Sequence, residues 1–320
     1  METRRLGNSD LELTVVGLGC WLMGKSEWHD VHDEQSVRAI HAALDAGINW
    51  VETAEVYGSG HTEELIGRVL AERGREEVLV ATKVWAGNLT AEGVPAALER
   101  SLQRLQTDYV DLYQIHRPSS EIPLSETMEA LVKEQQKGTL RHIGVSNFTV
   151  EQMQEALQYG PIVSSQPAYS LFFRYVESRE VPFCLENNIG ILPYSPLAQG
   201  LLTGKFTRDW RPAGDDNRRF NLLFREPTYG VALEQVEVLR EIGARYGKTP
   251  GQVAIRWMIQ QPAITSAIVG ARNEAHVADN LGAAGWELAP EDVAALSAAG
   301  DTVMATLPAG GEEVSMWDWS

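Results

Sequence analysis

Residues 48–83 read INWVETAEVYGSGHTEELIGRVLAERGREEVLVATK, and this stretch decides the fold. It opens with an apolar strand pattern at 48–53 and closes with a second one at 77–83. The segment 62–74 between them reads as an amphipathic helix. Strands that are apolar along their length and joined through a helix are typical of a parallel sheet covered on both faces.

The same alternation continues through the rest of the chain. Helices are predicted at 34–47, near 124–138, from Thr149 onward and between the remaining strands, and six further strands are predicted at 14–19, 109–116, 140–146, 161–166, 189–195 and 263–270. Eight βα units in 320 residues fit a (β/α)8 TIM barrel, which we expect to form a single domain over residues 1–320. The rival fold is a doubly wound sheet, whose glycine-rich turn is incomplete here because the third glycine is missing.

Segments outside the repeating units complete the predicted architecture. A hairpin-like stretch at 4–14 is expected to plug the bottom of the barrel. An extra helix and a tail that contains Trp317 and Trp319 follow the last unit. The connection from 196 to 229 is unusually long, and such loops are often functional.

Composition bounds the kind of partner. The formal net charge is −17, from 44 acidic and 27 basic residues, which argues against nucleic acid and anionic membranes as partners. No apolar run approaches the roughly 18 residues of a membrane span, and the first residues lack the apolar core of a secretion signal. Two cysteines give no disulfide framework, so a cytoplasmic location is expected. A homo-oligomer is compatible with the sequence.

Two stretches near the N-terminus imitate ligand sites. Residues 19–26, GCWLMGKS, match a phosphate-loop pattern, but the helical pattern begins only near Glu34 and the loop interior is bulky. His29, His32 and Asp33 resemble metal ligands, but no partner cluster appears elsewhere, so we expect no metal site.

Polar side chains stand where the predicted strands end. Glu52 and Tyr57 follow the strand at 48–53, Lys83 ends the strand at 77–83, and His116 ends the strand at 109–116. In a TIM barrel these strand ends meet at one mouth, which carries the active site. Contact with water explains one or two polar strand ends but explains these four together less well. Glu55, in the same loop as Tyr57, is expected to be a solvated residue.

These four side chains suit the protonation of an oxygen. The reference pKa of tyrosine, about 10, is too high for a good proton donor at neutral pH. A nearby lysine ammonium lowers that pKa, and a carboxylate keeps the lysine charged. A neutral histidine can hydrogen-bond a carbonyl group. The set fits carbonyl reduction by hydride transfer, and a nicotinamide cofactor is implied because no protein group supplies a hydride.

Part of the long connection at 196–229 has a positive net charge, opposite to that of the chain as a whole. Residues 205–225 hold six basic and three acidic side chains, a local charge of +3: Lys205, Arg208, Arg211, Arg218, Arg219 and Arg225 against Asp209, Asp215 and Asp216. The loop follows the seventh strand, where barrels often bind phosphate. An anionic ligand and a solvated loop are both compatible with this pattern.

Several long motifs, in order along nearly the whole chain, resemble the aldo-keto reductases. They are LTVVGLGCW (13–21), INWVETAEVYGSGHTEELIG (48–67), VLVATK (78–83), VDLYQIHRP (110–118), RHIGVSNF (141–148), PYSPLAQGLLTGK (193–205) and AIVGARNEAHVADNLGA (267–283). The resemblance implies a (β/α)8 barrel that uses NADPH, with NADH not excluded, to reduce a small or sugar-like carbonyl substrate. It implies Tyr57 as the general acid, Lys83 as the group that tunes its pKa, and His116 as the residue that orients the carbonyl.

The resemblance also assigns a cofactor groove. It implies that Ser146, Asn147 and Gln166 hold the nicotinamide carboxamide and that Tyr194 stacks on the nicotinamide ring. The pyrophosphate would lie along Ser195, Leu197, Gln199, Gly200 and Leu201. The adenosine and its 2′-phosphate would be held by Gly270, Arg272, His276, Asp279 and Asn280. Trp21 is expected to contact both the cofactor and the substrate. Trp28 and Trp85 are further candidate walls of the substrate pocket.

Glu52 departs from the family pattern, which usually has aspartate at this position. The extra methylene leaves two outcomes open: a working reductase in which Lys83 shifts slightly, or a slow one. A cofactor-binding regulatory subunit is therefore an alternative function. A lyase that uses Lys83 as a Schiff-base nucleophile is a third.

Overall fold

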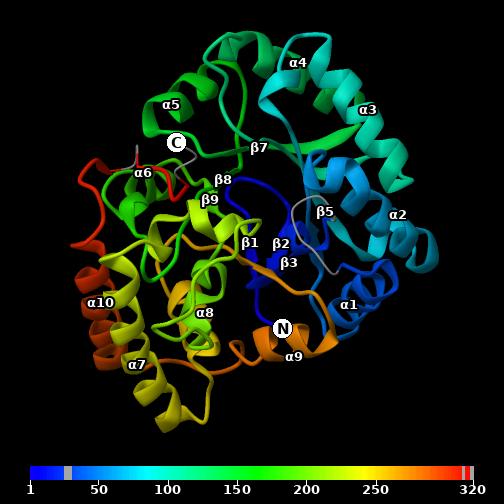
Figure 1. The fold of residues 1–320 in the computed structure, drawn as a ribbon. Helices are drawn as coiled ribbons and strands as arrows, with labels where there is room; N and C mark the ends of the chain where they lie inside the picture. Colours follow the sequence, from blue (N-terminus) through cyan, green and yellow to red (C-terminus); the bar gives the residue numbers. More distant parts are fainter. Residues whose placement is uncertain (25–30, 312–313, 318–320) are drawn as a thin grey trace.

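The fold is built on an eight-stranded parallel sheet. A computed structural model describes residues 1–24, 31–311 and 314–317 (Figure 1). The strands run in the order β10, β3, β4, β5, β6, β7, β8, β9. Their bounds are Ala267–Gly270, Val16–Gly19, Trp50–Glu52, Leu79–Val84, Val110–Ile115, Leu140–Ser146, Ser164–Gln166 and Gly190–Ile191. All eight predicted strands are confirmed, and each lies within its predicted segment or within one residue of it.

The two edge strands of the sheet meet and close it into a barrel. Ile191 at the end of β9 forms a parallel bridge with Ile264, just before β10. Backbone hydrogen bonds from Ile191 N to Ala263 O (3.2 Å) and from Ile268 N to Pro193 O (3.0 Å) reinforce this seam. The predicted TIM-barrel class is thus confirmed. The carboxyl ends of all eight strands face one mouth, as that fold requires.

Ten α-helices in the described part of the chain surround the barrel (Figure 1). They are α1 (Asp33–Asp45), α2 (His61–Arg73), α3 (Gly93–Leu105), α4 (Leu124–Lys137), α5 (Val150–Tyr159), α6 (Glu180–Glu186), α7 (Thr228–Tyr246), α8 (Pro250–Ile259), α9 (Glu274–Leu281) and α10 (Pro290–Met304). The amphipathic helix α3 buries one stripe that includes Val94, Leu98 and Leu105, whereas α8 is buried on all sides. The capping box expected at Thr149 and Gln152 forms at the start of α5, where each side chain accepts a backbone hydrogen bond from the other residue.

The N-terminal hairpin closes the bottom of the barrel. It consists of β1 (Thr3–Arg5) and β2 (Glu12–Thr14), paired antiparallel. Leu6, Leu11 and Leu13 lie in one buried cluster with Trp50 and with other apolar residues of the barrel strands. The hairpin therefore supplies the lower layer of the barrel core, as the sequence predicts.

The C-terminal segment returns to the mouth. After α10, which packs against α7, Met316 is buried and its carbonyl accepts a hydrogen bond of 3.0 Å from Leu222 N. Trp317 forms an antiparallel bridge with Asn221, and its ring meets that of Trp21 edge-on at 5.9 Å. The tail thus joins the long connection after β9 to the loop after β3. Trp319 lies outside the described residues.

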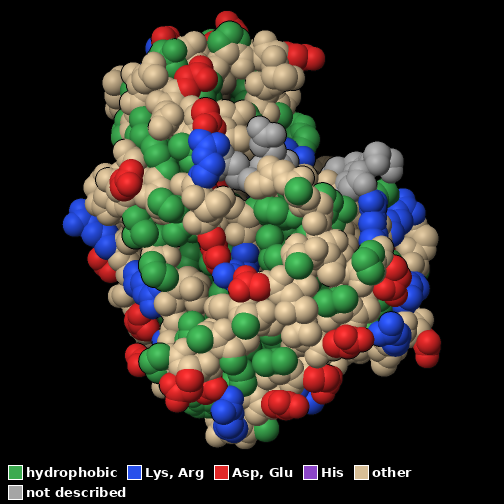
Figure 2. All heavy atoms as spheres, turned by 90° about the vertical axis from the view of Figure 1, so that its left-hand side faces the viewer, with side chains coloured by type: hydrophobic (Ala, Val, Ile, Leu, Met, Phe, Trp, Pro, Cys, Tyr) green, Lys and Arg blue, Asp and Glu red, His purple; other side chains and the backbone are tan. Residues whose placement is uncertain are grey.

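The surface carries both signs of charge. On the face shown in Figure 2, Lys and Arg side chains are scattered among Asp and Glu rather than gathered in one patch. None of the helices in the described ranges combines the length and the hydropathy needed to span a bilayer.

Candidate active site

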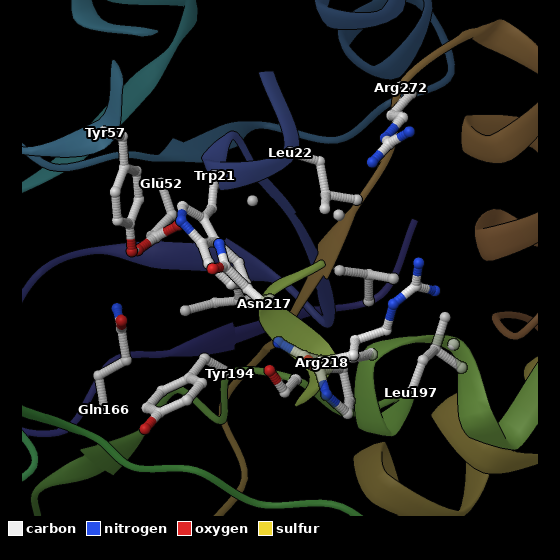
Figure 3. Close-up of a pocket in the computed structure, with 18 of the residues that line it drawn as sticks. Trp21, Leu22, Glu52, Tyr57, Gln166, Tyr194, Leu197, Asn217, Arg218 and Arg272 are labelled. Carbon is white, nitrogen blue, oxygen red and sulfur yellow. The ribbon is translucent and has the colours of Figure 1, made fainter. Parts of the chain in front are cut away.

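A cavity of about 540 Å³ opens at the carboxyl ends of the strands. Its volume falls in the range of small-molecule sites, roughly 300–1,000 Å³. Most of the predicted site residues line it: Trp21, Glu52, Tyr57, His116, Ser146, Asn147, Gln166, Tyr194, Ser195, Leu197, Gln199, Gly200, Gly270, Arg272, His276, Asp279 and Asn280. In Figure 3, Tyr57, Glu52, Gln166 and Tyr194 gather at one end, and Arg218 and Arg272 lie toward the other.

A buried lysine joins the carboxylate and the tyrosine that follow β4. Lys83 on β5 contacts the Glu52 carboxylate through its ammonium group and donates hydrogen bonds to Tyr57 Oη (2.8 Å) and to Thr53 O (2.9 Å). The ion pair is fully enclosed, since Lys83 is 0% and Glu52 3% exposed. The longer carboxylate of this chain therefore reaches the lysine. That contact removes the reason for favouring a regulatory subunit.

Burial governs the ionisation of these groups. It raises the pKa of Tyr57 well above its usual value, and the Glu52 carboxylate raises it further. The sequence indicates only the lowering effect of a nearby lysine, whereas desolvation and the Glu52 carboxylate give the Tyr57 pKa the opposite direction here. The role of Lys83 in tuning that pKa stays a prediction. Burial also lowers the pKa of Lys83, against the opposing effect of Glu52. Tyr57 consequently keeps its proton throughout the neutral range.

His116 is neutral in this setting. Burial, followed by the positive charges of Lys83 and Arg117, lowers its pKa well below the usual value. Its ring meets Tyr57 edge-on at 5.7 Å and Trp85 edge-on at 5.4 Å. The backbone carbonyl of His116, just after β6, accepts a hydrogen bond from Asn147 Nδ2 (2.9 Å), which helps to fix its position. The ring can therefore exchange a hydrogen bond with a substrate without carrying a charge.

The polar residues at the ends of β7, β8 and β9 form one hydrogen-bonded group. Ser146 Oγ donates to Gln166 O (2.7 Å), and Tyr194 Oη donates to Asn147 Oδ1 (2.8 Å). Ser146, Asn147 and Gln166, which the sequence predicts to hold the nicotinamide carboxamide, thus lie together beside Tyr194. Figure 3 shows Gln166 and Tyr194 next to each other at the end of the cavity that holds Tyr57.

The loop after β9 forms a tight cradle around Gln199. Ser195 (φ 57°), Ala198 (48°), Gln199 (54°) and Gly200 (90°) adopt the left-handed backbone region. The turn is closed by hydrogen bonds from Ala198 N to Ser195 O (2.8 Å) and from Gly200 N to Leu197 O (2.9 Å). Gln199 lines the cavity, and its Nε2 is buried without a hydrogen-bond partner in the described part of the chain. This unmet donor fits the pyrophosphate of a dinucleotide.

Basic side chains lie toward the far end of the groove. Lys205 and Arg218 line the cavity together with Arg272, and the pKa of Lys205 is lowered by burial and then by those two arginines. Arg218 is itself paired with Asp216 at 2.5 Å. The +3 segment in the sequence indicated Lys205 and Arg218 as a basic loop but did not place either one in the site.

Several cavity residues were not identified as site residues from the sequence. Besides Lys205 and Arg218, the cavity is lined by Leu22, Arg117, Thr203, Asn217 and Trp317. Asn217 and Arg218 come from the long connection, whose length was a signal of function. Arg117 follows His116 in sequence, but this adjacency does not predict that the Arg117 side chain lines the cavity.

Three predicted site residues lie elsewhere in the described structure. Lys83 is behind Tyr57 rather than on the cavity wall, as a group that acts through the tyrosine would be, and this enclosed position also speaks against a Schiff-base nucleophile. Leu201 is packed in the core instead of lining the cavity. Trp85 is 39% exposed and covers His116 from outside the cavity. Trp28 falls outside the described residues, as does His29.

Glu55 is buried rather than solvated, so that expectation is wrong. It is 8% exposed, and one carboxylate oxygen accepts hydrogen bonds from Trp85 N (2.7 Å) and Asn88 Nδ2 (3.0 Å). The other oxygen pairs with Arg100 at 3.5 Å. Glu55 therefore ties the loop after β4 to the loop after β5.

In the described part of the chain, no group of three or more His, Cys, Asp or Glu side chains is arranged to hold a metal ion.

Comparison with known proteins agrees with this geometry. The family model described as "Aldo/keto reductase family" matches residues 15–301. The chain is 37% identical over 302 residues to aldo-keto reductase YhdN of Bacillus subtilis (strain 168), covering 91% of each protein. It is 33% identical to the NADH-specific methylglyoxal reductase of Escherichia coli (strain K12), covering 91% of this chain and 96% of that protein.

A solved structure gives the same result at the level of the fold. The glycerol dehydrogenase AKR11B4 from Gluconobacter oxydans superimposes with a TM-score of 0.88 and 34% identity, covering 96% of this chain and 98% of that one. The family match spans most of the chain and includes every strand of the barrel. The chain therefore belongs to the aldo/keto reductase family, whose members reduce carbonyl groups with nicotinamide cofactors.

Proposed function

We propose that this protein reduces small or sugar-like aldehydes and ketones to alcohols, with NADPH as the hydride source. The observation that supports this most directly is the hydrogen bond from Lys83 Nζ to Tyr57 Oη (2.8 Å), formed beside the Glu52 carboxylate at the wall of the cavity. It fixes a neutral phenol, next to a neutral histidine, where a carbonyl oxygen can approach both. Electrostatic preorganisation of this kind stabilises a developing oxyanion.

The roles of the residues follow from these contacts. NADPH held by the groove residues would supply the hydride that reaches the carbonyl carbon. Tyr57 hydrogen-bonds the carbonyl oxygen and transfers its phenolic proton as negative charge develops there, and Lys83 then stabilises the phenolate that remains. His116, uncharged, orients the carbonyl oxygen without competing for that proton. Solvent later returns a proton to Tyr57.

The chain's own residues fit the dinucleotide along the whole groove. Ser146, Asn147 and Gln166 would hold the carboxamide, and the cradle around Gln199 would hold the pyrophosphate. Lys205 has no hydrogen bond or ion pair in the described part of the chain; its ammonium lies close to Gly200 and 5.1 Å from the centroid of the Phe206 ring. Lys205 and Arg272 together suit a 2′-phosphate, which favours NADPH over NADH. The NADH specificity of the Escherichia coli relative makes NADH the necessary comparison.

The cellular setting is part of the proposal. Cys20 and Cys184 are both buried and free, which suits a protein of the reducing cytoplasm. The substrate is a small molecule, because the cavity is enclosed by the mouth of a single barrel.

The test is a steady-state assay of NADPH and NADH oxidation over a panel of aldehydes and ketones, with Tyr57→Phe as the variant. Loss of a general acid typically lowers the rate by roughly 10²- to 10⁴-fold, and NADPH affinity should be retained. Tyr159→Phe, on the outer helix α5, removes the same atom at a 39% exposed position and serves as the control. Retention of the wild-type rate by Tyr57→Phe would show that the proton comes from elsewhere.

A further inference from the structure

Arg117 is a cation of the cavity that no side chain in the described ranges neutralises. It follows His116 directly after β6 and lines the cavity. Its side chain makes no hydrogen bond or ion pair with any residue in the part of the chain that the structure describes, and its Nε is buried without a partner. A guanidinium carries several N–H donors, so this leaves an unusual amount of hydrogen-bonding capacity unused.

Several other part-buried arginines form ion pairs. Arg75 and Arg141 both bind Asp111 at 2.7 Å, Arg104 binds Glu63 at 2.7 Å, and Arg174 binds Glu177 at 2.8 Å. Arg256 has no ion pair in the described ranges, but its Nε donates a hydrogen bond to Gln260 Oε1 (2.8 Å). A desolvated charge is costly unless it is paired. Within the described residues, Arg117 has neither kind of partner, so its guanidinium is open to a ligand.

The position of Arg117 separates it from the groups that suit the cofactor phosphates. Its charge adds to the burial that lowers the pKa of His116 and opposes the burial that raises the pKa of Tyr194 to about 12, and both residues lie at the end of the cavity where the chemistry occurs. Lys205 instead has Arg218, Arg272 and Asp216 as its charged neighbours. The described cavity thus has basic groups in two places, and only the second coincides with the expected phosphate positions.

The charge balance of the cavity favours an anionic guest. Among the described residues, its lining includes four basic residues, Arg117, Lys205, Arg218 and Arg272, and two acidic ones, Glu52 and Asp279. Arg218 is paired with Asp216 behind the wall. Glu52 is already paired with Lys83, and Asp279 accepts a hydrogen bond from Gln252 Nε2 (2.9 Å). In a chain of net charge −17, such a local excess of positive charge concentrates anions at the mouth.

We propose that the preferred substrates are carbonyl compounds that carry a carboxylate or another oxyanion, and that Arg117 binds this group while Tyr57 and His116 hold the carbonyl oxygen. The proposal rests on the reductase function proposed above and names its substrate class. Guanidinium and carboxylate match in a planar, two-pronged geometry, so the contact also fixes the orientation of the substrate.

The experiment compares matched substrate pairs. One pair is succinic semialdehyde and its neutral amide; the other is glyceraldehyde phosphate and glyceraldehyde. For each pair, kcat/KM is measured for the wild type, Arg117→Gln, Arg117→Lys and Arg68→Gln. Arg68 lies on the outer helix α2, pairs with Glu34 and does not line the cavity, so it controls for the loss of one charge.

The wild type should prefer the anionic member of at least one pair by roughly 10- to 100-fold, the scale of a charge-assisted hydrogen bond. Arg117→Gln should reduce this ratio to about one, Arg117→Lys should retain part of it, and Arg68→Gln should leave it intact. Preference within the phosphate pair alone would identify the oxyanion as a phosphate. Reduction of all four compounds without an anionic preference, or with one that survives Arg117→Gln, overturns the inference and leaves the reductase function standing.

A binding measurement keeps the inference testable without turnover. Butanoate and butanamide are titrated calorimetrically into the complex of the enzyme with NADP⁺. Butanoate should bind more tightly than butanamide, and the difference should disappear in Arg117→Gln. Equal binding of the two ligands refutes the anion site, whereas failure to oxidise NADPH or NADH with any carbonyl compound refutes the reductase function separately.

Discussion

Glu52→Gln should move the high-pH limb of the pH–rate profile to lower pH. The substitution keeps the length of the side chain but removes the charge that contacts Lys83 and lies 3.4 Å from Tyr57 Oη. Glu52 opposes the burial that lowers the pKa of Lys83, and it adds to the burial that raises the pKa of Tyr57. Without it, both pKa values fall, so both groups lose their protons at lower pH.

The size of the shift follows from the contact. A hydrogen bond to a charged group contributes about 1.5–3 kcal/mol, and one pKa unit corresponds to about 1.4 kcal/mol. The limb should therefore move down by roughly one to two pH units. It is measured as kcat/KM against pH with an uncharged aldehyde, because kcat/KM reports the ionisations of the free enzyme. NADPH affinity, determined by fluorescence titration, should stay within about threefold, since Glu52 is not among the residues expected to hold the cofactor.

Glu52→Asp is the companion variant. It withdraws the carboxylate by about one carbon–carbon bond, roughly 1.5 Å, but keeps its charge near Lys83. The limb should stay close to its wild-type position while kcat falls, because the lysine and the tyrosine lose their fixed geometry. A Glu52→Gln profile that coincides with the wild type would refute the assigned electrostatics. A Glu52→Asp variant faster than the wild type would show that glutamate is a poor substitute here.

Three further predictions concern the surroundings of the site. Lys205→Ala should weaken NADPH binding roughly tenfold and NADH binding little, measured by titration; an equal loss for both cofactors would remove the 2′-phosphate assignment. Glu55→Gln should speed amide hydrogen exchange in the loop after β5 by roughly tenfold or more, since it weakens the carboxylate contacts to that loop; unchanged exchange at Asn88 would contradict this. Asp111→Asn should lower the free energy of unfolding by about 3–5 kcal/mol in urea denaturation, because two arginines share this 1% exposed carboxylate. The control Asp10→Asn, at the exposed end of the same network, should lower it by less than about 1 kcal/mol. Similar losses for the two variants would refute the distinction between the buried and the exposed carboxylate.

The barrel could be predicted because its signals are local. Each buried parallel strand is a short apolar run, such as residues 78–81, and each is followed by a helical stripe. Catalytic candidates could be found for the same reason: Lys83 and His116 end such runs, and the fold brings those ends together. The short extent of β9 could not be foreseen, because Tyr194 beyond it pairs only through an isolated bridge to Ala168.

The features that could not be predicted from the sequence depend on contacts between loops that are distant in the chain. Glu55 reads as a loop carboxylate, and only the fold brings the backbone of Trp85 within 2.7 Å of it. Trp317 reads as part of a tail, and its place beside Trp21 depends on the burial of Met316. The direction of the Tyr57 pKa shift also needed the structure, because it is set by how completely the phenol is enclosed.

The hairpin and Trp317 lie at opposite ends of the barrel, which has a practical consequence for handling the protein. The hairpin covers the bottom of the barrel, whereas Trp317 lines the cavity at the mouth. A label attached near Trp317 would stand at the cavity wall, while one attached to the hairpin would stand on the far side of the barrel. Immobilisation on a support, or linkage to a cofactor-recycling partner, is therefore best made through the hairpin, which leaves the entrance open to solution.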